Sequence, residues 1–218
     1  MKPVLFVICH MLYLVKTPWW LKKIYAGCVW QMPSADKTIY LSFDDGPHPE
    51  ITPYVLATLQ QYNAKATFFC IGKNVAANPD TYQKIVAAGH SVGNHSHHHL
   101  NGWKTPNEDY LGNIALAKEY IHSNLFRPPY GRATRQQLKL LSLPPYGLTP
   151  VMWTVLSGDF DRGISREKCL DNVLRNTTNG SIVLFHDSEK AFDKMKYALQ
   201  GVLEHFSRAG FQFKKIVI

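Results

Sequence analysis

The chain has little cysteine, and the few cysteines form no recognisable pair. Cys9, Cys28, Cys70 and Cys169 are the four in 218 residues; they lie far apart, include no CxxC pair and stand in apolar surroundings such as ATFFCIG. Such spacing gives no disulfide framework. We therefore predict reduced thiols in the core, which favours a reducing compartment.

Runs of like charge, internal repeats, linkers and low-complexity segments are also absent. The formal net charge of +8 favours anionic partners, but the Lys and Arg residues are spread along the chain and form no basic run. No specific nucleic-acid partner is therefore predicted. With 45% apolar and 18% charged residues, the composition predicts a single globular domain.

No hydrophobic run is long enough for a bilayer span. The run VLFVICHMLYLV after Lys2 resembles the hydrophobic region of a signal peptide, but it contains His10 and no small-x-small cleavage site follows. We interpret residues 1–37 as an apolar lead-in segment that either packs on the domain or serves in targeting. If the protein associates with a membrane, we expect it to do so through this segment only, and the location is left between the cytoplasm and the cell envelope.

From Thr38 onward, short apolar runs alternate with helical patterns. The runs are strand-length and rich in β-branched or aromatic residues; they cover residues 38–43, 64–72, 90–94, 125–130, 150–155, 181–186 and 213–218. Between them, helix starts are predicted at Thr52–Pro53, at Asn78–Pro79, at a capping box formed by Thr105 and Glu108, at Ser165, and at Glu189 for a helix ending at Arg208.

This alternation predicts parallel βα units. Two architectures fit, an open doubly wound sheet and a closed barrel. About seven units in a chain of this length, with no GxGxxG turn after the first strand, favour the compact barrel-like form.

Polar side chains stand where the predicted strands end. The C-terminal ends of parallel strands converge on one face, where active sites are built. Five separated stretches supply side chains to that face, and they contain Asp44, Asp45, His95, Arg127, Asp159 and His186. Each alone has a structural explanation, but their convergence predicts a site.

The stretch GHSVGNHSHHHLNG contains five histidines and suggests a metal site. His95 and His99 are four residues apart and can reach one ion if the backbone turns helically. A catalytic zinc needs three protein ligands and an open position, which these histidines and one aspartate would supply. The HExxH motif is absent, so the base must come from elsewhere; if Asp45 is the ligand, Asp44 is the candidate base.

The remaining polar residues suit hydrolysis. Arg127 would keep Asp44 ionised and oriented, His186 would protonate a leaving group, and Asp159 would keep that imidazole charged. The backbone amide near Tyr130 could complete an oxyanion site. Together these groups could hydrolyse an amide or an ester.

Four short motifs resemble those of the NodB-homology polysaccharide deacetylases, carbohydrate esterase family four. SFDDGP, HSHHH, RPPY and LFH follow one another in the order of the family's motifs, and the resemblance covers about residues 38–218. It implies a distorted (β/α)7 barrel in a single domain, with residues 38–218 as the catalytic domain. It also implies a divalent metal, usually zinc, and removal of N-acetyl groups from N-acetylglucosamine-containing glycans such as peptidoglycan or chitin oligomers.

The resemblance implies a role for each matching residue. Asp44 becomes the base and His186 the acid, while Arg127 orients the base. The metal ligands become Asp45, His95 and His99. The amide of Tyr130 helps to hold the acetyl oxygen, and Leu184 forms part of the acetate pocket.

One motif departs from the family pattern. Where the family often has D-[SA]-x-D-W, this chain reads LSGDF, so Leu156 replaces the first Asp and Phe160 replaces the Trp. Asp159 keeps the acidic position that tunes the acid histidine, although Asp161 is an alternative. Because Phe160 corresponds to a pocket-wall residue, substrate preference is what this variation affects. Hydrolysis of another C–N bond or of an O-acetyl ester, and a non-catalytic glycan- or metal-binding module, remain alternatives.

Overall fold

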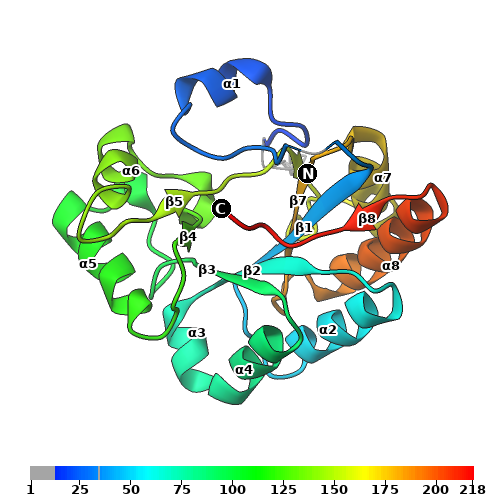
Figure 1. The fold of residues 1–218 in the computed structure, drawn as a ribbon, viewed down its shortest axis with the longest axis horizontal. Helices are drawn as coiled ribbons and strands as arrows, with labels where there is room; N and C mark the ends of the chain where they lie inside the picture. Colours follow the sequence, from blue (N-terminus) through cyan, green and yellow to red (C-terminus); the bar gives the residue numbers. More distant parts are fainter. Residues whose placement is uncertain (1–12, 34) are drawn as a thin grey trace, which may run out of the picture.

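The computed structural model describes residues 13–33 and 35–218, and a curved parallel sheet lies at its centre (Figure 1). The strands are β1 (Thr38–Asp44), β2 (Ala66–Cys70), β3 (Ser91–Asn94), β4 (Leu125–Phe126), β5 (Thr149–Pro150), β6 (Val155–Leu156), β7 (Ile182–His186) and β8 (Gln212–Phe213). Seven follow one another in the order β5-β4-β3-β2-β1-β7-β6, and β8 pairs with the start of β1. This path forms a half-barrel in a single domain, which confirms the predicted distorted (β/α)7 barrel.

Helices surround the sheet on the outside (Figure 1). They are α1 (Trp19–Ile24), α2 (Ile51–Gln61), α3 (Gly72–Ala77), α4 (Pro79–Ala87), α5 (Asn107–Lys118), α6 (Arg135–Leu141), α7 (Arg166–Asn176) and α8 (Phe192–Arg208). Two short 3-10 turns, η1 (Gly102–Lys104) and η2 (Pro129–Gly131), lie in the loops after β3 and β4. Because the strands are parallel, the loops that follow their C-terminal ends gather at one end of the half-barrel.

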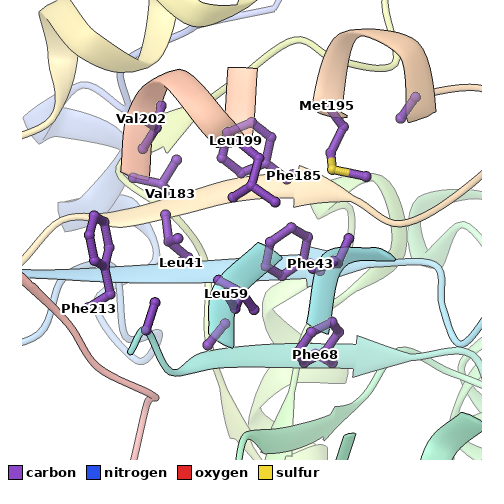
Figure 2. Close-up of a cluster of buried hydrophobic side chains, with 14 of the residues drawn as sticks. Leu41, Phe43, Leu59, Phe68, Val183, Phe185, Met195, Leu199, Val202 and Phe213 are labelled. Atoms are coloured by element: carbon purple, nitrogen blue, oxygen red, sulfur yellow. The ribbon is translucent and has the colours of Figure 1, made fainter. Parts of the chain in front are cut away.

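Strand β1 is central, and its two faces serve different purposes. All seven of its residues are buried, as expected for a parallel strand covered on both sides. On the face toward α2 and α8, the ring of Phe43 stacks on Phe68 at 5.0 Å and on Phe185 at 5.9 Å between centroids (Figure 2). Burying each such ring stabilises the fold by about 1.5–3 kcal/mol. The opposite face carries Ser42 and Asp44 toward the site.

Residues 13–33 lie against both ends of the strand path. Leu156 in β6 donates its N–H to the carbonyl of Val15 at 2.8 Å. Further along the segment, Met152, just after β5, donates to the carbonyl of Val29 at 2.7 Å. Exposed strand edges leave backbone groups unpaired. The segment therefore bridges the gap between the two terminal strands, and Figure 1 shows α1 on this side of the half-barrel.

Three predicted strands are wrong in extent. The run 125–130 is a strand only at its start, because β4 ends at Phe126 and Pro129–Gly131 form η2. Residues 150–155 do not form one strand, because Pro150 ends β5 and Val155 begins β6 at the opposite end of the path. The carbonyls of Val151 and Met152 between them accept hydrogen bonds from the side chain of Arg127 instead of from a neighbouring strand.

The C-terminal run 213–218 also differs from its prediction, because β8 ends at Phe213. Beyond it, the N–H of Ile216 donates to the hydroxyl of Thr67, and the carbonyl of Ile216 accepts from the hydroxyl of Ser91. Side chains thus satisfy backbone groups that a strand partner would otherwise have bonded.

Some predicted helix starts are confirmed. Pro79 is the first residue of α4, and the hydroxyl of Ser165 caps α7 by accepting the N–H of Lys168 at 3.2 Å. Helix α8 ends at Arg208 as predicted but begins at Phe192 rather than Glu189.

Two predicted caps are wrong. Thr52 lies inside α2, and its hydroxyl accepts the N–H of His48 rather than capping a helix. The box predicted at Thr105 does not form, because the Thr105 hydroxyl donates to the carbonyl of Asn101. A reciprocal capping box exists at Thr134 and Gln137 of α6, a helix that the sequence patterns did not reveal.

Cys28, Cys70 and Cys169 are buried free thiols, which confirms the prediction for these three. Cys9 and most of the apolar run after Lys2 lie outside the described residues. Within the described part of the chain, none of the helices has the length and apolar character needed to cross a bilayer. The boundary between residues 37 and 38, the role of the lead-in segment and the cellular location stay predictions.

Candidate active site

A cavity of about 910 Å³ opens at the C-terminal ends of the strands, where the sequence predicted a site. Eight of the predicted site residues line it: Asp44, Asp45, His95, His99, Tyr130, Phe160, Leu184 and His186. The other two, Arg127 and Asp159, are fully buried behind this lining, and each bonds to one of its members. The structure thus brings all ten residues to one place.

Asp44 and Asp45 are adjacent in sequence, yet both reach the cavity. Alternation along β1 directs Ser42 and Asp44 to the same face and would direct the next residue away. Asp45 instead has a φ of +83°, a left-handed conformation that Asp tolerates better than most residues. This turn ends the alternation, and it is held by the Asn74 side chain, which donates to the Asp45 carbonyl at 2.7 Å.

His95 and His99 meet through a loop and not through the helical turn that the sequence suggested. Residues 95–99 include two non-glycine residues with positive φ, Ser96 at +61° and His99 at +57°. The side-chain oxygen of Asn113 accepts hydrogen bonds from the N–H groups of His97 and His98, so these groups are satisfied without a helical turn. The ring of His98 faces Asn113 instead of the cavity.

The donor set of Asp45, His95 and His99 fits a divalent transition metal. One ligand atom from each lies within 4.8 Å of the others. The Nε2 atom of His99 is 3.4 Å from Oδ1 of Asp45, close to the separation of about 3.4 Å expected for two ligands of a tetrahedral zinc. Three protein ligands leave a position open, as a catalytic site requires.

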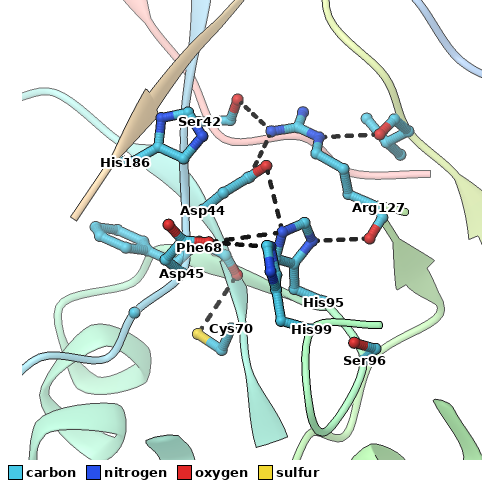
Figure 3. A network of polar contacts seen from close by, with 12 residues as sticks. Ser42, Asp44, Asp45, Phe68, Cys70, His95, Ser96, His99, Arg127 and His186 are labelled. Carbon is cyan, nitrogen blue, oxygen red and sulfur yellow. Dashed lines mark hydrogen bonds and ion pairs between the residues drawn. The ribbon is translucent and has the colours of Figure 1, made fainter. Parts of the chain in front are cut away.

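Hydrogen bonding and burial prepare His95 for this role (Figure 3). Its Nδ1 lies 2.8 Å from the carbonyl of Arg127, an acceptor, so Nδ1 carries the proton and the Nε2 lone pair is left for an ion. Burial, with a smaller contribution from the charge of His99, holds the pKa of His95 well below its ordinary value. Burial also lowers the pKa of His99. Neutral imidazoles are the form that binds metals.

Arg127 is a buried clamp for Asp44. Its Nη1 donates to Oδ1 of Asp44 and to the hydroxyl of Ser42, both at 2.8 Å (Figure 3). Its Nε and Nη2 donate to the carbonyls of Val151 and Met152. These four bonds fix the guanidinium in one orientation, and the Asp44 carboxylate with it.

His186 ends β7 and forms a second pair, with the buried Asp159. Its Nδ1 lies 2.8 Å from Oδ1 of Asp159, and its backbone N–H donates to Oδ2 at 2.7 Å. Burial by itself lowers the pKa of His186, but the charge and hydrogen bond of Asp159, together with the more distant Asp45 and Asp44, outweigh it and raise the pKa to about 9. The alternative partner, Asp161, accepts the N–H of Gly163 instead.

Three predicted substrate-contacting residues border this pair and the histidines. The ring of Phe160 packs edge-on against His186, with centroids 5.3 Å apart. Tyr130, at a φ of +60° in η2, places its ring 4.5 Å from that of His99. Leu184 lies two residues before His186 on the same face of β7 and lines the cavity. The role of the Tyr130 amide stays a prediction.

Sequence reasoning missed Asp187, which is buried beneath the loop that carries Asp45. Its carboxylate accepts the N–H of Gly46 at 3.0 Å and the hydroxyl of Thr52 at 2.5 Å. Burial raises the pKa of Asp187 to about 7, with the charge of Asp45 acting in the same direction. Its position directly after His186 could have predicted a structural role, because a carboxyl group at the end of a buried strand needs hydrogen-bond partners.

A parallel half-barrel with carboxylates and histidines at its strand ends defines a barrel-type α/β enzyme with a hydrolytic site. The polysaccharide deacetylase family model matches residues 31–148, more than half of the chain. The chain therefore belongs to the polysaccharide deacetylase family, and the predicted family is confirmed.

Curated relatives and solved structures agree with this assignment. A peptidoglycan-N-acetylglucosamine deacetylase of Bacillus cereus is 33% identical over 190 residues, which cover 84% of this chain and 88% of the relative. A chitooligosaccharide deacetylase of Azorhizobium caulinodans is 34% identical over 157 residues, covering 69% of this chain and 73% of the relative. The crystal structure of the Bc1960 peptidoglycan N-acetylglucosamine deacetylase in complex with 4-naphthalen-1-yl-N-oxidanyl-benzamide superposes with a TM-score of 0.82 at 30% identity, covering 92% of this chain and 95% of that chain.

Proposed function

We propose that this protein removes N-acetyl groups from N-acetylglucosamine-containing glycans of the peptidoglycan or chitin type. One observation carries the proposal. Asp44, clamped by the buried Arg127, lies beside the donor set of Asp45, His95 and His99, while His186 lines the same cavity. The names of the relatives, which act on peptidoglycan and on chitooligosaccharides, support the substrate class.

The proposed cofactor is Zn²⁺, held by Asp45, His95 and His99. Two imidazoles and one carboxylate with an open position form a set typical of catalytic zinc. A divalent ion held there would polarise the amide carbonyl and make a bound water more acidic. The protein's own contribution is to keep both imidazoles neutral and the carboxylate aimed at them.

Asp44 and His186 supply the proton transfers. Asp44 accepts a proton from the attacking water as the new C–O bond forms at the acetyl carbon. His186 gives its proton to the sugar nitrogen as the C–N bond breaks, so the products are acetate and a free amine. Arg127 and Asp159 act through these two residues as positioning groups. The Tyr130 amide would hold the acetyl oxygen, and Leu184 and Phe160 would enclose the methyl group.

The test is acetate release by the zinc-loaded protein from acetylated chito-oligosaccharides, muropeptides and acetylated xylan. We expect acetate, with an equal amount of new free amine, from an N-acetylated substrate. Release from xylan alone would replace the proposal by an O-acetyl esterase. Release from another amide alone would indicate a different C–N hydrolase. A folded, zinc-loaded protein that turns over none of them would be a glycan- or metal-binding module.

A further inference from the structure

The active-site cavity has a second wall that carries no catalytic group. This wall comes from residues 13–33, most of which precede the part of the chain that the family model matches. Apart from Thr17 and Cys28, its lining side chains are aromatic or aliphatic, and they include Tyr13, Leu21, Tyr25 and Trp30. The cavity is therefore polar at the strand ends and apolar along this wall.

The wall is held in place by hydrogen bonds along its length. The hydroxyl of Thr17 donates to the carbonyl of Trp153 at 2.7 Å, and the indole N–H of Trp30 donates to the carbonyl of Tyr25 at 3.0 Å. Trp30 is buried, and it packs with Cys28 and Met152 in a small apolar cluster of its own. A surface fixed in this way is preformed for a ligand.

Ring contacts connect the wall to the catalytic end of the cavity. The ring of Tyr13 lies 5.3 Å from that of Phe160, which in turn lies 5.3 Å from the ring of His186. The ring of Phe160 thus lies between the wall and the acid histidine, in contact with both. The two surfaces belong to one continuous cavity.

Two further aromatic side chains of the cavity lining are widely exposed. Trp103 is 58% exposed and Tyr130 is 59% exposed, and both line the cavity. Exposed aromatic surface in a concave site is typical of a ligand-binding surface. The volume of about 910 Å³ lies at the upper end of the range of about 300–1,000 Å³ for ligand pockets, which leaves room beyond a single sugar ring.

We propose that residues 13–33 form a subsite for the sugar ring next to the one that is deacetylated. The apolar C–H face of a neutral pyranose would pack on Leu21 and Tyr25, which line the same cavity as Trp103. This inference rests on the proposed function, since it takes the ligand to be an acetylated oligosaccharide. The subsite makes the enzyme prefer oligomers over the single sugar.

The experiment compares kcat/KM for N-acetylglucosamine and for its β-1,4-linked dimer to pentamer. Leu21→Ala and Tyr25→Ala should lower the ratio of kcat/KM for the pentamer to that for the monosaccharide by about tenfold, the low end of what an apolar pocket contact is worth. Trp19→Ala and Trp20→Ala are matched controls on α1, because both side chains are exposed and neither lines the cavity. The controls should stay within about twofold of the wild-type ratio.

Folding is checked in each variant by its thermal midpoint and its zinc content. Because Leu21 and Tyr25 both also pack on the apolar cluster, binding is measured directly as well as turnover: the affinity for the pentamer is determined by calorimetry in an Asp44→Asn background with and without Tyr25→Ala. A folded Tyr25→Ala that binds the pentamer as tightly as its parent, or controls that lose as much as the wall variants, would overturn the subsite. A wild-type kcat/KM that is independent of chain length would also overturn it, whereas failure to hydrolyse any N-acetyl glycan would overturn the proposed function.

Discussion

The two walls of the cavity are built in opposite ways. At the strand ends, Asp44 and His95 are 3% and 2% exposed, and the groups behind them, Arg127 and Asp159, are not exposed at all. On the wall formed by residues 13–33, the lining residues are apolar except for Thr17, most of them are half-exposed or exposed, and they belong to a segment that pairs with sheet edges. Proton transfer and metal binding need side chains held in one geometry away from water, which buried pairs provide. Packing against a sugar face requires shape and apolar area only.

The metal ligands should show the largest effect. His95→Ala and Asp45→Ala should lose bound zinc and all detectable activity together, because the two ligands that remain do not make a catalytic site. His98→Ala is the control in the same histidine tract, since its ring contacts Asn113 and not the cavity. Elemental analysis and acetate release measure both properties. Zinc retained at full occupancy in Asp45→Ala would show that another residue holds the ion.

Asp44→Asn should separate chemistry from metal binding. The amide keeps the shape of the carboxylate but cannot accept the proton, so turnover should fall by about 10²- to 10⁴-fold. Zinc content should stay close to that of the wild type, because Asp44 is not in the donor set. A zinc-free Asp44→Asn together with a zinc-loaded Asp45→Ala would mean that the two aspartates have exchanged roles.

Asp159→Asn tests the pairing of Asp159 with His186 through the pH dependence of kcat/KM. His186 must be protonated to act, and its pKa of about 9 keeps it protonated through neutral pH. Without the charge of Asp159, burial dominates and the pKa falls, so the alkaline limb of kcat/KM should move to lower pH by about one unit or more. Protonation of His186 also stabilises the fold. Its contribution to the free energy of unfolding is complete below pH 6.5 and is lost as the pH rises through about 9.

Asp161→Asn is the matched control for that profile, because its carboxylate bonds to the N–H of Gly163 and not to His186. Its alkaline limb should coincide with that of the wild type. If the limb moves in Asp161→Asn and stays in place in Asp159→Asn, the assignment of the histidine's partner is wrong.

The smallest expected effect is on the stability with which residues 13–33 are attached to the sheet. Thr17→Val removes the hydroxyl that donates to the carbonyl of Trp153 while keeping the side-chain volume. The free energy of unfolding should fall by about 1 kcal/mol, the usual worth of one such bond. Chemical denaturation measures it, with Trp20→Ala as an exposed control expected to change it by less than about 0.5 kcal/mol. A Thr17→Val variant as stable as the wild type would show that the other backbone pairs alone hold this segment.

Much of the site could be predicted because its residues stand at strand ends. Asp44 follows an apolar run of strand length, and His186 ends another, so the convergence of parallel strands was enough to bring them together. Long strands such as β1 and β7 were predicted within a few residues for the same reason. The two-residue strands β5 and β6 were not, because the backbone carbonyls between them bond to the side chain of Arg127, which is distant in sequence.

The sequence by itself determined the family, the alternation of strands and helices along most of the chain, and the residue types available at the strand ends, because these follow from local periodicity and from motifs of a few residues. The tertiary structure decided the rest. It made Asp159 rather than Asp161 the partner of His186, set Asp187 against Gly46 across 141 positions of sequence, and brought residues 13–33 between the terminal strands. Each of these contacts joins segments whose approach depends on how the whole sheet curves, and no local pattern encodes that curvature.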